Sequence, residues 1–280
     1  MNISKTKIVA DSSADVTALD GVEFASTPLK IITAEKQYID NEALDVEEMV
    51  NDLQRYNGKS STSCPNADDW LSTFGDAENV FCVTITGTLS GSYNSAMTAK
   101  QIYEEEHPDR RVFVLNSLSA GPELALMTEK LRDLILEGKE FDEVCSEIND
   151  YTKKTGLLFM LESMKNLANN GRVSPIVAKV VGLLDIRVVG KASDKGDLEP
   201  LNKCRGEKKA LETIVRHMKE LGLKAGKVKI AHCLNEKAGI ALRELIHKEF
   251  GKIKVELYKC RGLCSFYAEK GGMLVGFEKA

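Results

Sequence analysis

The chain has 280 residues, 43% of them hydrophobic, and a formal net charge of −4 at pH 7. This length and apolar content suit one large domain or two packed lobes. The small acidic excess leaves no surplus of lysine and arginine to neutralise phosphates, which argues against nucleic acid as a partner.

The cysteines and the N-terminus indicate a cytoplasmic protein. The cysteines number seven without a CxxC pair, and an odd count in a chain of this length predicts reduced thiols rather than a disulfide framework. The spacing of His232-Cys233, Cys260 and Cys264 matches no zinc motif, so we expect neither a metal nor a cofactor. The first residues lead straight into a strand, with no signal-peptide core and no long apolar run, so we expect no stable membrane insertion.

Strands and helices alternate in the first half of the chain, which predicts a parallel sheet covered by helices. A hydroxyl-rich loop at Gly58–Asp69 interrupts the alternation, and such a loop can cradle a polar ligand group or merely connect two elements. The other elements expected up to residue 155 are strands or extended segments at Lys7–Ala10, Val22–Thr33, Lys36–Asp40, Val80–Thr86 and Arg111–Leu115, and helices at Asp45–Arg55, Asp68–Phe74, Tyr93–Tyr103, Glu123–Leu136 and Phe141–Thr155.

Small and polar residues follow two of these strands directly. Asp11-Ser12-Ser13 comes after the first strand, where ligands sit in open α/β sheets, although such residues also form ordinary turns and caps. Gly87–Ser92, with two glycines among hydroxyls, joins a buried strand to a helix. The unpaired N–H groups of a helix N-terminus favour an anion, and hydroxyls at Thr88, Ser90 and Ser92 could donate further hydrogen bonds. The alternative is that Ser90 or Ser92 only caps the helix.

The pattern changes near residue 155, and we expect a first lobe over residues 1–150 and a second α/β lobe over residues 151–280. Asp194–Asp197 has the composition of a hairpin turn between two strands. Val228–Leu234, Glu236–Phe250 and Ile253–Tyr258 predict a strand–helix–strand unit. The other elements expected in this lobe are strands at Gly156–Glu162, Ile186–Ala192, Leu198–Cys204 and Met273–Phe277, and helices at Met164–Asn170, Arg172–Leu184 and Glu207–Leu221.

Residue types that carry catalysis are sparse. None of the four histidines lies near a nucleophile elbow such as GxSxG, and no paired carboxylates indicate acid–base chemistry. His232 ends an apolar strand and is interpreted as a satisfied, partly buried histidine. Hydroxyl-rich turns at strand ends together with much apolar surface suit a small amphiphile with an anionic head group. These features favour a binding protein, while an active site assembled from distant residues stays an alternative.

Several sequence motifs, in the same order and spacing, resemble those of the DegV family of bacterial fatty acid-binding proteins along nearly the whole chain. Asp11–Val16 reads DSSADV, which is similar to the family's DSTADL, and Leu89–Ala96 resembles its LSGTYxSA element. Ser61–Pro65 resembles its TSQP loop, with Cys64 in place of the usual glutamine. The other matching elements are Pro28-Leu29 with Tyr38–Asp40, Leu161–Ser174, Leu183–Ile186 and Arg205-Gly206.

The resemblance implies an α/β fold of two lobes, a parallel-sheet Rossmann-like N-terminal lobe and a C-terminal α/β lobe, with a ligand tunnel between them. One long-chain fatty acid would lie in the tunnel, and its carboxylate would be held by the residues that match Thr62 and Ser90. Ser63, beside Thr62, is a further candidate. Family members of this kind present the acid to a separate fatty acid kinase and are not enzymes themselves.

Arg172 and Arg205 match arginines of the family motifs, and each stands next to a glycine. We expect both to be exposed near the tunnel mouth and to dock the kinase. The alternative is an ordinary surface arginine paired with a nearby carboxylate.

One position departs from the family pattern. The family usually has a histidine before its last strand, close to the carboxylate, whereas this chain has none there. Matching back from Gly276-Phe277 without gaps places Tyr267 at that position, and a shift of one residue would place Ala268 there. A phenol donates one hydrogen bond and, with a pKa of about 10, carries no positive charge at neutral pH. We therefore expect neutral donors and the helix N-terminus to hold the head group.

A hypothesis of a different class stays open, namely an enzyme or transferase that acts on a small phosphorylated or carboxylated ligand at the Ser90 turn. Mass spectrometry of an organic extract separates the two hypotheses. Stoichiometric fatty acid favours the binding protein, and an empty protein that binds nucleotides or sugar phosphates favours the enzyme.

Overall fold

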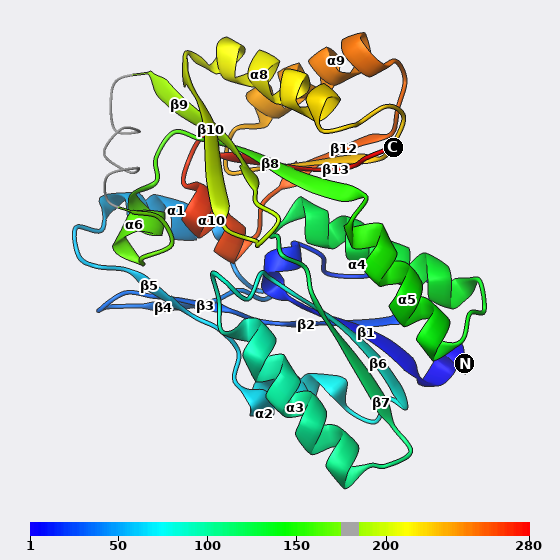
Figure 1. Cartoon of the computed structure of the whole chain (residues 1–280). Coiled ribbons are helices and arrows are strands. Elements are labelled where there is room, and N and C mark those ends of the chain that lie inside the picture. Colours follow the sequence, from blue (N-terminus) through cyan, green and yellow to red (C-terminus); the bar gives the residue numbers. More distant parts are fainter. Residues whose placement is uncertain (175–184) are drawn as a thin grey trace.

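The computed structural model describes residues 1–174 and 185–280 (Figure 1). The N-terminal lobe is built on a four-stranded sheet in the order β2-β1-β6-β7, and every neighbouring pair in it is parallel. The parallel sheet predicted from the alternating elements is therefore confirmed. Its strands are β1 (Thr6–Asp11), β2 (Glu23–Thr27), β6 (Asn79–Thr84) and β7 (Arg111–Asn116), and short 3-10 helices at Ile3–Lys5 and Ser12–Ala14 flank β1.

Helices cover both faces of the parallel sheet (Figure 1). Trp70 and Phe74 of α2 and Ala96 of α3 pack on one face. Leu131 of α4 and Ile148 of α5 pack on the other face. The four helices are α2 (Ala67–Phe74), α3 (Ser92–Glu106), α4 (Pro122–Leu136) and α5 (Phe141–Thr152).

A small antiparallel sheet branches off where the sequence predicted one extended run and a loop. The run expected over Val22–Thr33 breaks at Pro28, which has no N–H for a ladder, and at Leu29, whose N–H donates to Ser12 Oγ at 3.0 Å. The loop expected at Gly58–Asp69 contains a strand that pairs with the residues after this break. The sheet has the order β4-β3-β5, and its elements are β3 (Lys30–Ile32), β4 (Gln37–Ile39) and β5 (Ser61–Ser63), with α1 (Val46–Arg55) between β4 and β5.

The C-terminal lobe is built on a six-stranded mixed sheet in the order β10-β9-β8-β13-β11-β12. β11 and β12 run parallel with α9 between them, which confirms the predicted strand–helix–strand unit, and the other neighbouring pairs are antiparallel. The strands are β8 (Thr155–Leu161), β9 (Ile186–Ala192), β10 (Leu198–Arg205), β11 (Val228–His232), β12 (Val255–Lys259) and β13 (Met273–Glu278).

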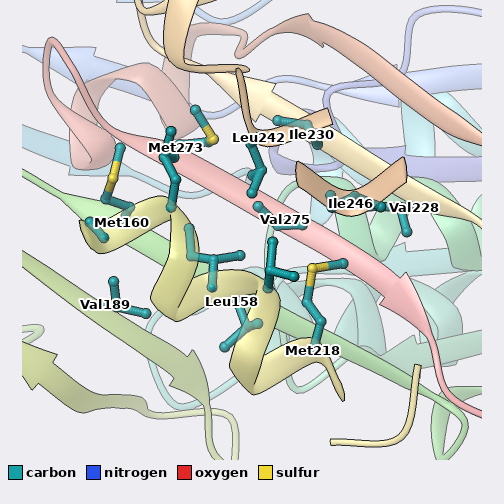
Figure 2. Packing of buried hydrophobic residues seen from close by; sticks show 14 of the residues in the cluster. Leu158, Met160, Val189, Met218, Val228, Ile230, Leu242, Ile246, Met273 and Val275 are labelled. Atoms are coloured by element: carbon teal, nitrogen blue, oxygen red, sulfur yellow. The ribbon is translucent and has the colours of Figure 1, made fainter. Parts of the chain in front are cut away.

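The outer face of the mixed sheet is covered by α8 (Glu207–Glu220) and α9 (Glu236–Phe250). Figure 2 shows the core between them, where Leu158 and Val275 from neighbouring strands meet Met218 of α8 and Leu242 of α9. Fully burying an aliphatic side chain of this size stabilises the fold by about 1.5–3 kcal/mol. This cluster therefore fixes β8 and β13 firmly, and the opposite face of these strands faces the N-terminal lobe.

Two short helices, α6 (Lys165–Asn169) and α10 (Gly262–Ala268), lie at one end of the mixed sheet. The sequence does not predict α10, because its N-terminus depends on a residue far away in the chain. Asp40 accepts the N–H groups of Gly262 and Leu263, both at 2.8 Å, across more than 200 residues. The helix predicted over Arg172–Leu184 and the match at Leu183-Leu184 fall largely outside the described residues.

α4 joins the two lobes. It contacts β1 and β6 of the parallel sheet on one side and β8, β11 and β13 of the mixed sheet on the other. Figure 1 shows it with α5 between the two sheets, so the layers run α2/α3, parallel sheet, α4/α5, mixed sheet, α8/α9. The chain passes from one sheet to the other between α5 and β8, and a domain boundary at residue 150 stays a prediction.

Candidate functional site

An apolar cavity of about 80 Å³ lies between the lobes, at the carboxyl ends of the parallel strands. This is the edge at which open α/β sheets bind ligands. Turns that follow β2, β6 and β7 form one side of it, and the mixed sheet and α10 form the other. The described residues that line the cavity are Leu29, Thr62, Ile85, Leu89, Ser90, Ala120, Leu157, Phe159, Leu161, Leu167, Arg172, Leu198, Leu263, Cys264, Tyr267, Ala268 and Leu274.

Four of the residues predicted from the sequence meet at this cavity: Thr62, Ser90, Tyr267 and Arg172. Thr62 Oγ1 and Tyr267 Oη are 2.7 Å apart, although 205 positions separate the two residues in the chain. The Arg172 guanidinium lies 6.0 Å from the centroid of the Tyr267 ring. The fold thus brings the TSQP-like loop into contact with Tyr267, the residue that we expect at the position of the missing histidine. We call these four residues the polar pole of the cavity.

Among the described residues, the hydroxyl groups of the polar pole keep hydrogens without an acceptor, which a ligand could use. Thr62 and Tyr267 share one hydrogen bond, so the hydrogen of the acceptor hydroxyl remains available. Ser90 Oγ accepts the N–H of Ser92 at 3.3 Å, which leaves the Ser90 O–H available as well. Burial raises the pKa of Tyr267, so its phenol stays protonated and neutral at physiological pH. The pole can therefore donate to a carboxylate from both sides without losing an existing bond.

Asp11 positions the turn that carries Ser90. Its buried carboxylate accepts the Ile85 N–H at 2.9 Å and the Ser92 hydroxyl at 2.6 Å, on the two sides of Ser90. It also accepts hydrogen bonds from the N–H and the hydroxyl of Ser13. Burial raises the pKa of Asp11 despite these donors. The polar cluster after β1 is thus a scaffold for the Ser90 turn and is not among the residues that line the cavity.

The three hydroxyl groups of the Gly87–Ser92 turn have different partners. Ser92 Oγ donates to Asp11 and Thr88 Oγ1 donates to the carbonyl oxygen of Gly196 at 2.9 Å, so Ser90 is the hydroxyl of the three that lines the cavity. Ser90 also bonds the first N–H of α3, as a cap would, while the N-cap residue Gly91 has no side chain for this. Both interpretations of the turn, cap and ligand donor, therefore describe the same serine.

Arg172 differs from the expectation of an exposed docking residue. It is half-buried, its Nε donates to the carbonyl oxygen of Leu89 at 3.1 Å, and its Nη1 donates to that of Asn170 at 2.5 Å. A guanidinium carries its charge at any physiological pH. Arg172 therefore adds a positive charge to a cavity at which the sequence led us to expect neutral donors and the helix N-terminus, and which of these groups holds a head group stays a prediction.

Ser63 and Arg205 do not line the cavity. Neighbouring residues of a strand point to opposite faces, so Ser63 turns away when Thr62 faces the cavity, and its hydroxyl donates to the carbonyl oxygen of Cys64 at 3.2 Å. Arg205 is exposed, as expected, at the end of β10. Leu198, at the other end of the same strand, lines the cavity, and at about 3.3 Å per residue the two ends of β10 are roughly 20 Å apart.

The walls are apolar because β8 turns one face to the cavity. Leu157, Phe159 and Leu161 occupy alternate positions of this strand and line the cavity together. The Phe159 ring lies on Gly190 of β9, where a Cβ atom would be only 2.2 Å from the ring carbon Cζ. The sequence does not identify these wall residues, because β8 is buried on both faces and shows no polar alternation.

Buried aspartates hold α10, which supplies Leu263, Cys264 and Ala268 to the wall. Besides the N–H groups that Asp40 accepts, Asp15 Oδ1 accepts the N–H of Arg261 at 3.0 Å. Burial and the neighbouring Asp40 raise the pKa of Asp15 to about 8, and within the described part of the chain Asp15 Oδ2 has no hydrogen-bond partner. Sequence reasoning assigned neither aspartate a role, although both stand inside matched family motifs, DSSADV and YID.

Residues 1–174 and 185–280 contain no group of three or more His, Cys, Asp or Glu residues arranged to hold a metal ion. His232 is buried, its Nδ1 accepts the N–H of Asn235 at 3.2 Å, and burial lowers its pKa, so the interpretation as a satisfied histidine is confirmed. In the same part of the chain, no helix has the length and apolar character needed to cross a membrane.

The fold and the site define a two-lobed α/β protein with an apolar cavity between the lobes and a polar pole at that cavity. A family model described as "Uncharacterised protein, DegV family" matches residues 5–279. The chain belongs to the DegV family, as the sequence motifs predicted.

Relatives match the chain over nearly its full length. A DegV domain-containing protein of Streptococcus pneumoniae is 45% identical over 276 residues, which cover 97% of this chain and 98% of the relative. A DegV family protein from Eubacterium eligens, solved loaded with heptadecanoic acid, superimposes with a TM-score of 0.96 at 42% identity and covers 98% of this chain and 100% of its own. The Fatty Acid Kinase (Fak) B3 protein of Streptococcus pneumoniae, solved loaded with linoleic acid, superimposes with a TM-score of 0.96 at 44% identity. The match covers 99% of this chain and 100% of that protein.

Proposed function

We propose that this protein binds one long-chain fatty acid in the cavity between its lobes and is not itself an enzyme. The observation that carries the proposal is the convergence of Thr62, Ser90, Tyr267 and Arg172 at an otherwise apolar cavity. The two related structures above, each more than 40% identical, are loaded with long-chain acids, which supports the same ligand class. The protein would act in the cytoplasm.

In this proposal the polar pole orients the acid and the walls supply the affinity. Ser90 and the free hydrogen of the Thr62–Tyr267 pair donate to the carboxylate, and Arg172 balances its charge. A hydrogen bond to a charged group contributes about 1.5–3 kcal/mol. Each buried methylene contributes about 0.8 kcal/mol, so a chain of about 14 methylenes offers roughly 11 kcal/mol before ordering costs.

The acyl chain needs more room than the cavity provides in this structure. Its volume of about 80 Å³ is well below the ~150 Å³ of a dry protein cavity that takes up one benzene molecule. Binding of a long acid therefore requires the apolar walls to move apart.

The bound acid would be presented to a separate fatty acid kinase, which phosphorylates its carboxylate. Support comes from the name of the related B3 protein, which refers to such a kinase. Arg205 is the candidate docking residue, because it is exposed and outside the cavity. Arg205→Glu should lower acyl phosphate formation with a cognate kinase and leave acid binding unchanged, with Lys203→Glu on the same strand as the matched control. If Arg205→Glu lowers acid binding as much as it lowers acyl phosphate formation, Arg205 is not part of the docking surface.

Extraction of the purified protein with organic solvent and mass spectrometry of the extract test the ligand. We expect about one long-chain fatty acid per chain. A protein that yields no acid, fails to take up added acid and binds nucleotides or sugar phosphates would instead support an enzyme or transferase at the Ser90 turn.

A further inference from the structure

The hairpin turn Ser193–Asp197, between β9 and β10, touches the N-terminal lobe through Gly196. Asp194, Lys195 and Asp197 are exposed, whereas Gly196 is buried. Its carbonyl oxygen accepts a hydrogen bond from Thr88 Oγ1 at 2.9 Å. Gly196 has a φ of 85°, and a Cβ atom there would lie 2.1 Å from Thr86 Oγ1. A side chain at this position would clash with the Thr86 hydroxyl, so the glycine allows the close contact with the natural threonine.

This turn lies beyond the part of the mixed sheet in which β8 supports β9. The pairing of β8 with β9 ends at Leu158 and Lys191, so the hairpin projects beyond it. β10 is an edge strand, and its register with β9 shifts between Pro200 and Asn202, where a bulge lets a strand bend. Within the turn, the N–H of Ser193 donates to the carbonyl oxygen of Asp197 at 2.8 Å. The turn can therefore move as one piece once its contact with the N-terminal lobe opens.

The same contact lies beside the cavity. Leu198 directly follows the turn and lines the cavity in a half-buried position, as do Leu89 and Ser90 on the opposite side. Within residues 1–174 and 185–280, hydrogen bonds from Thr88 to Gly196 and from Arg172 to Leu89 cross between these sides. Separating the hairpin from the Thr86–Thr88 segment would widen the cavity towards solvent.

We propose that the 193–197 hairpin turn is a gate of the cavity and that the contact of Thr88 with Gly196 is its latch. The gate rests on the proposed function, because it controls the exchange of the fatty acid. A gate changes the rates of entry and release together and leaves the equilibrium affinity nearly unchanged.

The first test is Thr88→Val, which removes the hydroxyl donor and keeps the shape of the side chain. Stopped-flow mixing with cis-parinaric acid, an intrinsically fluorescent fatty acid, gives both rates, and equilibrium titration gives the affinity. We expect both rates to rise about fivefold, the factor that corresponds to one ordinary hydrogen bond, while the dissociation constant changes less than about twofold. Thr98→Val, an exposed threonine of α3, is the matched control. Unchanged rates, or a weaker affinity with an unchanged entry rate, would overturn the gate.

The second test locks the gate in the pair Thr86→Cys and Gly196→Cys. The Cβ positions of the two residues are 3.0 Å apart, slightly closer than the roughly 3.5–4.5 Å of a disulfide. Exchange of cis-parinaric acid should nearly stop in the oxidised protein and recover with reductant, whereas Thr86→Cys alone should show neither effect. Exchange at the wild-type rate in the cross-linked protein would overturn the gate. Failure of the wild-type protein to bind the acid at all would instead contradict the proposed function.

Discussion

The two lobes bring different chemistry to the one cavity. The N-terminal lobe contributes short hydroxyl side chains, with Ser90 in a turn that follows a parallel strand and Thr62 on the short strand β5. The C-terminal lobe contributes the face of a mixed sheet, with Leu157, Phe159 and Leu161 in a row. Strand ends leave polar groups free, whereas a strand face inside a sheet has its backbone groups paired and presents side chains alone. The difference teaches that orientation and affinity for a ligand come from different parts of this fold.

Two residues of the C-terminal lobe depart from this division. Tyr267 and Arg172 stand on that side of the cavity, yet they belong to the polar pole. Each contacts the N-terminal lobe, Tyr267 at Thr62 and Arg172 at Leu89, so the pole is assembled only when the lobes are packed together.

The length of the acyl chain should have the largest effect, because it probes the apolar side alone. Shortening a saturated acid by about six methylenes should weaken binding by about 5 kcal/mol. Competitive displacement of cis-parinaric acid by acids of different length measures this loss. A loss below about 1 kcal/mol would show that the polar pole, and not the wall, supplies the affinity.

The dependence of stability on pH tests the contact between the lobes at Asp15, which accepts the N–H of Arg261. Its folded-state pKa of about 8 lies above its ordinary value of 3.8, so between these values the unfolded chain releases a proton that the folded chain keeps. This carboxyl group therefore lowers stability as pH rises towards 8, by up to about 1.4 kcal/mol per pH unit.

Asp15→Asn removes this loss and keeps an oxygen acceptor for the N–H of Arg261. We expect its advantage in unfolding free energy over the wild type to grow by up to roughly 2–3 kcal/mol between about pH 5.5 and 7.5. Urea unfolding at the two pH values measures it. A difference that stays constant between them would show that Asp15 is already ionised in the folded protein.

Thr62→Ala and Ser90→Ala probe the polar side of the cavity. Each should weaken fatty acid binding by about 1–3 kcal/mol through the loss of a hydrogen bond to a charged group. Ser63→Ala is the matched control, because Ser63 sits beside Thr62 and does not line the cavity. Thermal melts of the ligand-free variants separate binding from folding. Unchanged affinity in both variants would contradict the head-group assignment, and lower melting temperatures with normal affinity would leave Ser90 as a cap alone.

Tyr267 should give the smallest effect, because Thr62 and Arg172 remain when the phenol is lost. Tyr267→Phe should weaken binding by about 1 kcal/mol, the net value of a typical hydrogen bond. Wild-type affinity should vary little between about pH 5.5 and 7.5, since neither a phenol nor a guanidinium titrates there, whereas Tyr267→His should introduce a pH dependence in that window. Normal binding by Tyr267→Phe would reduce the phenol to a packing role.

The sequence predicted the elements that local patterns determine and failed where distant residues decide. The parallel sheet and the strand–helix–strand unit follow from alternation and periodicity, which neighbouring residues carry. α10 depends on bonds to Asp40, and the half-burial of Arg172 depends on a carbonyl group of the other lobe. The family motifs and the position of the missing histidine pointed to Thr62, Ser90 and Tyr267, which line one cavity. They could not separate Thr62 from Ser63, because that choice depends on which face of β5 meets the cavity.

The position of α4 between the two sheets has a consequence for how the molecule comes apart. The helix is buried along most of its length, and it gives Leu124 and Leu131 to the core beneath the parallel sheet while it also packs on β11 and β13. If either sheet unfolded alone, the face of α4 that packs on it would lose its contacts, and the apolar residues of that face would be exposed to water. Both lobes should therefore lose their structure in one cooperative transition, and fragments cut near residue 150 should not fold by themselves.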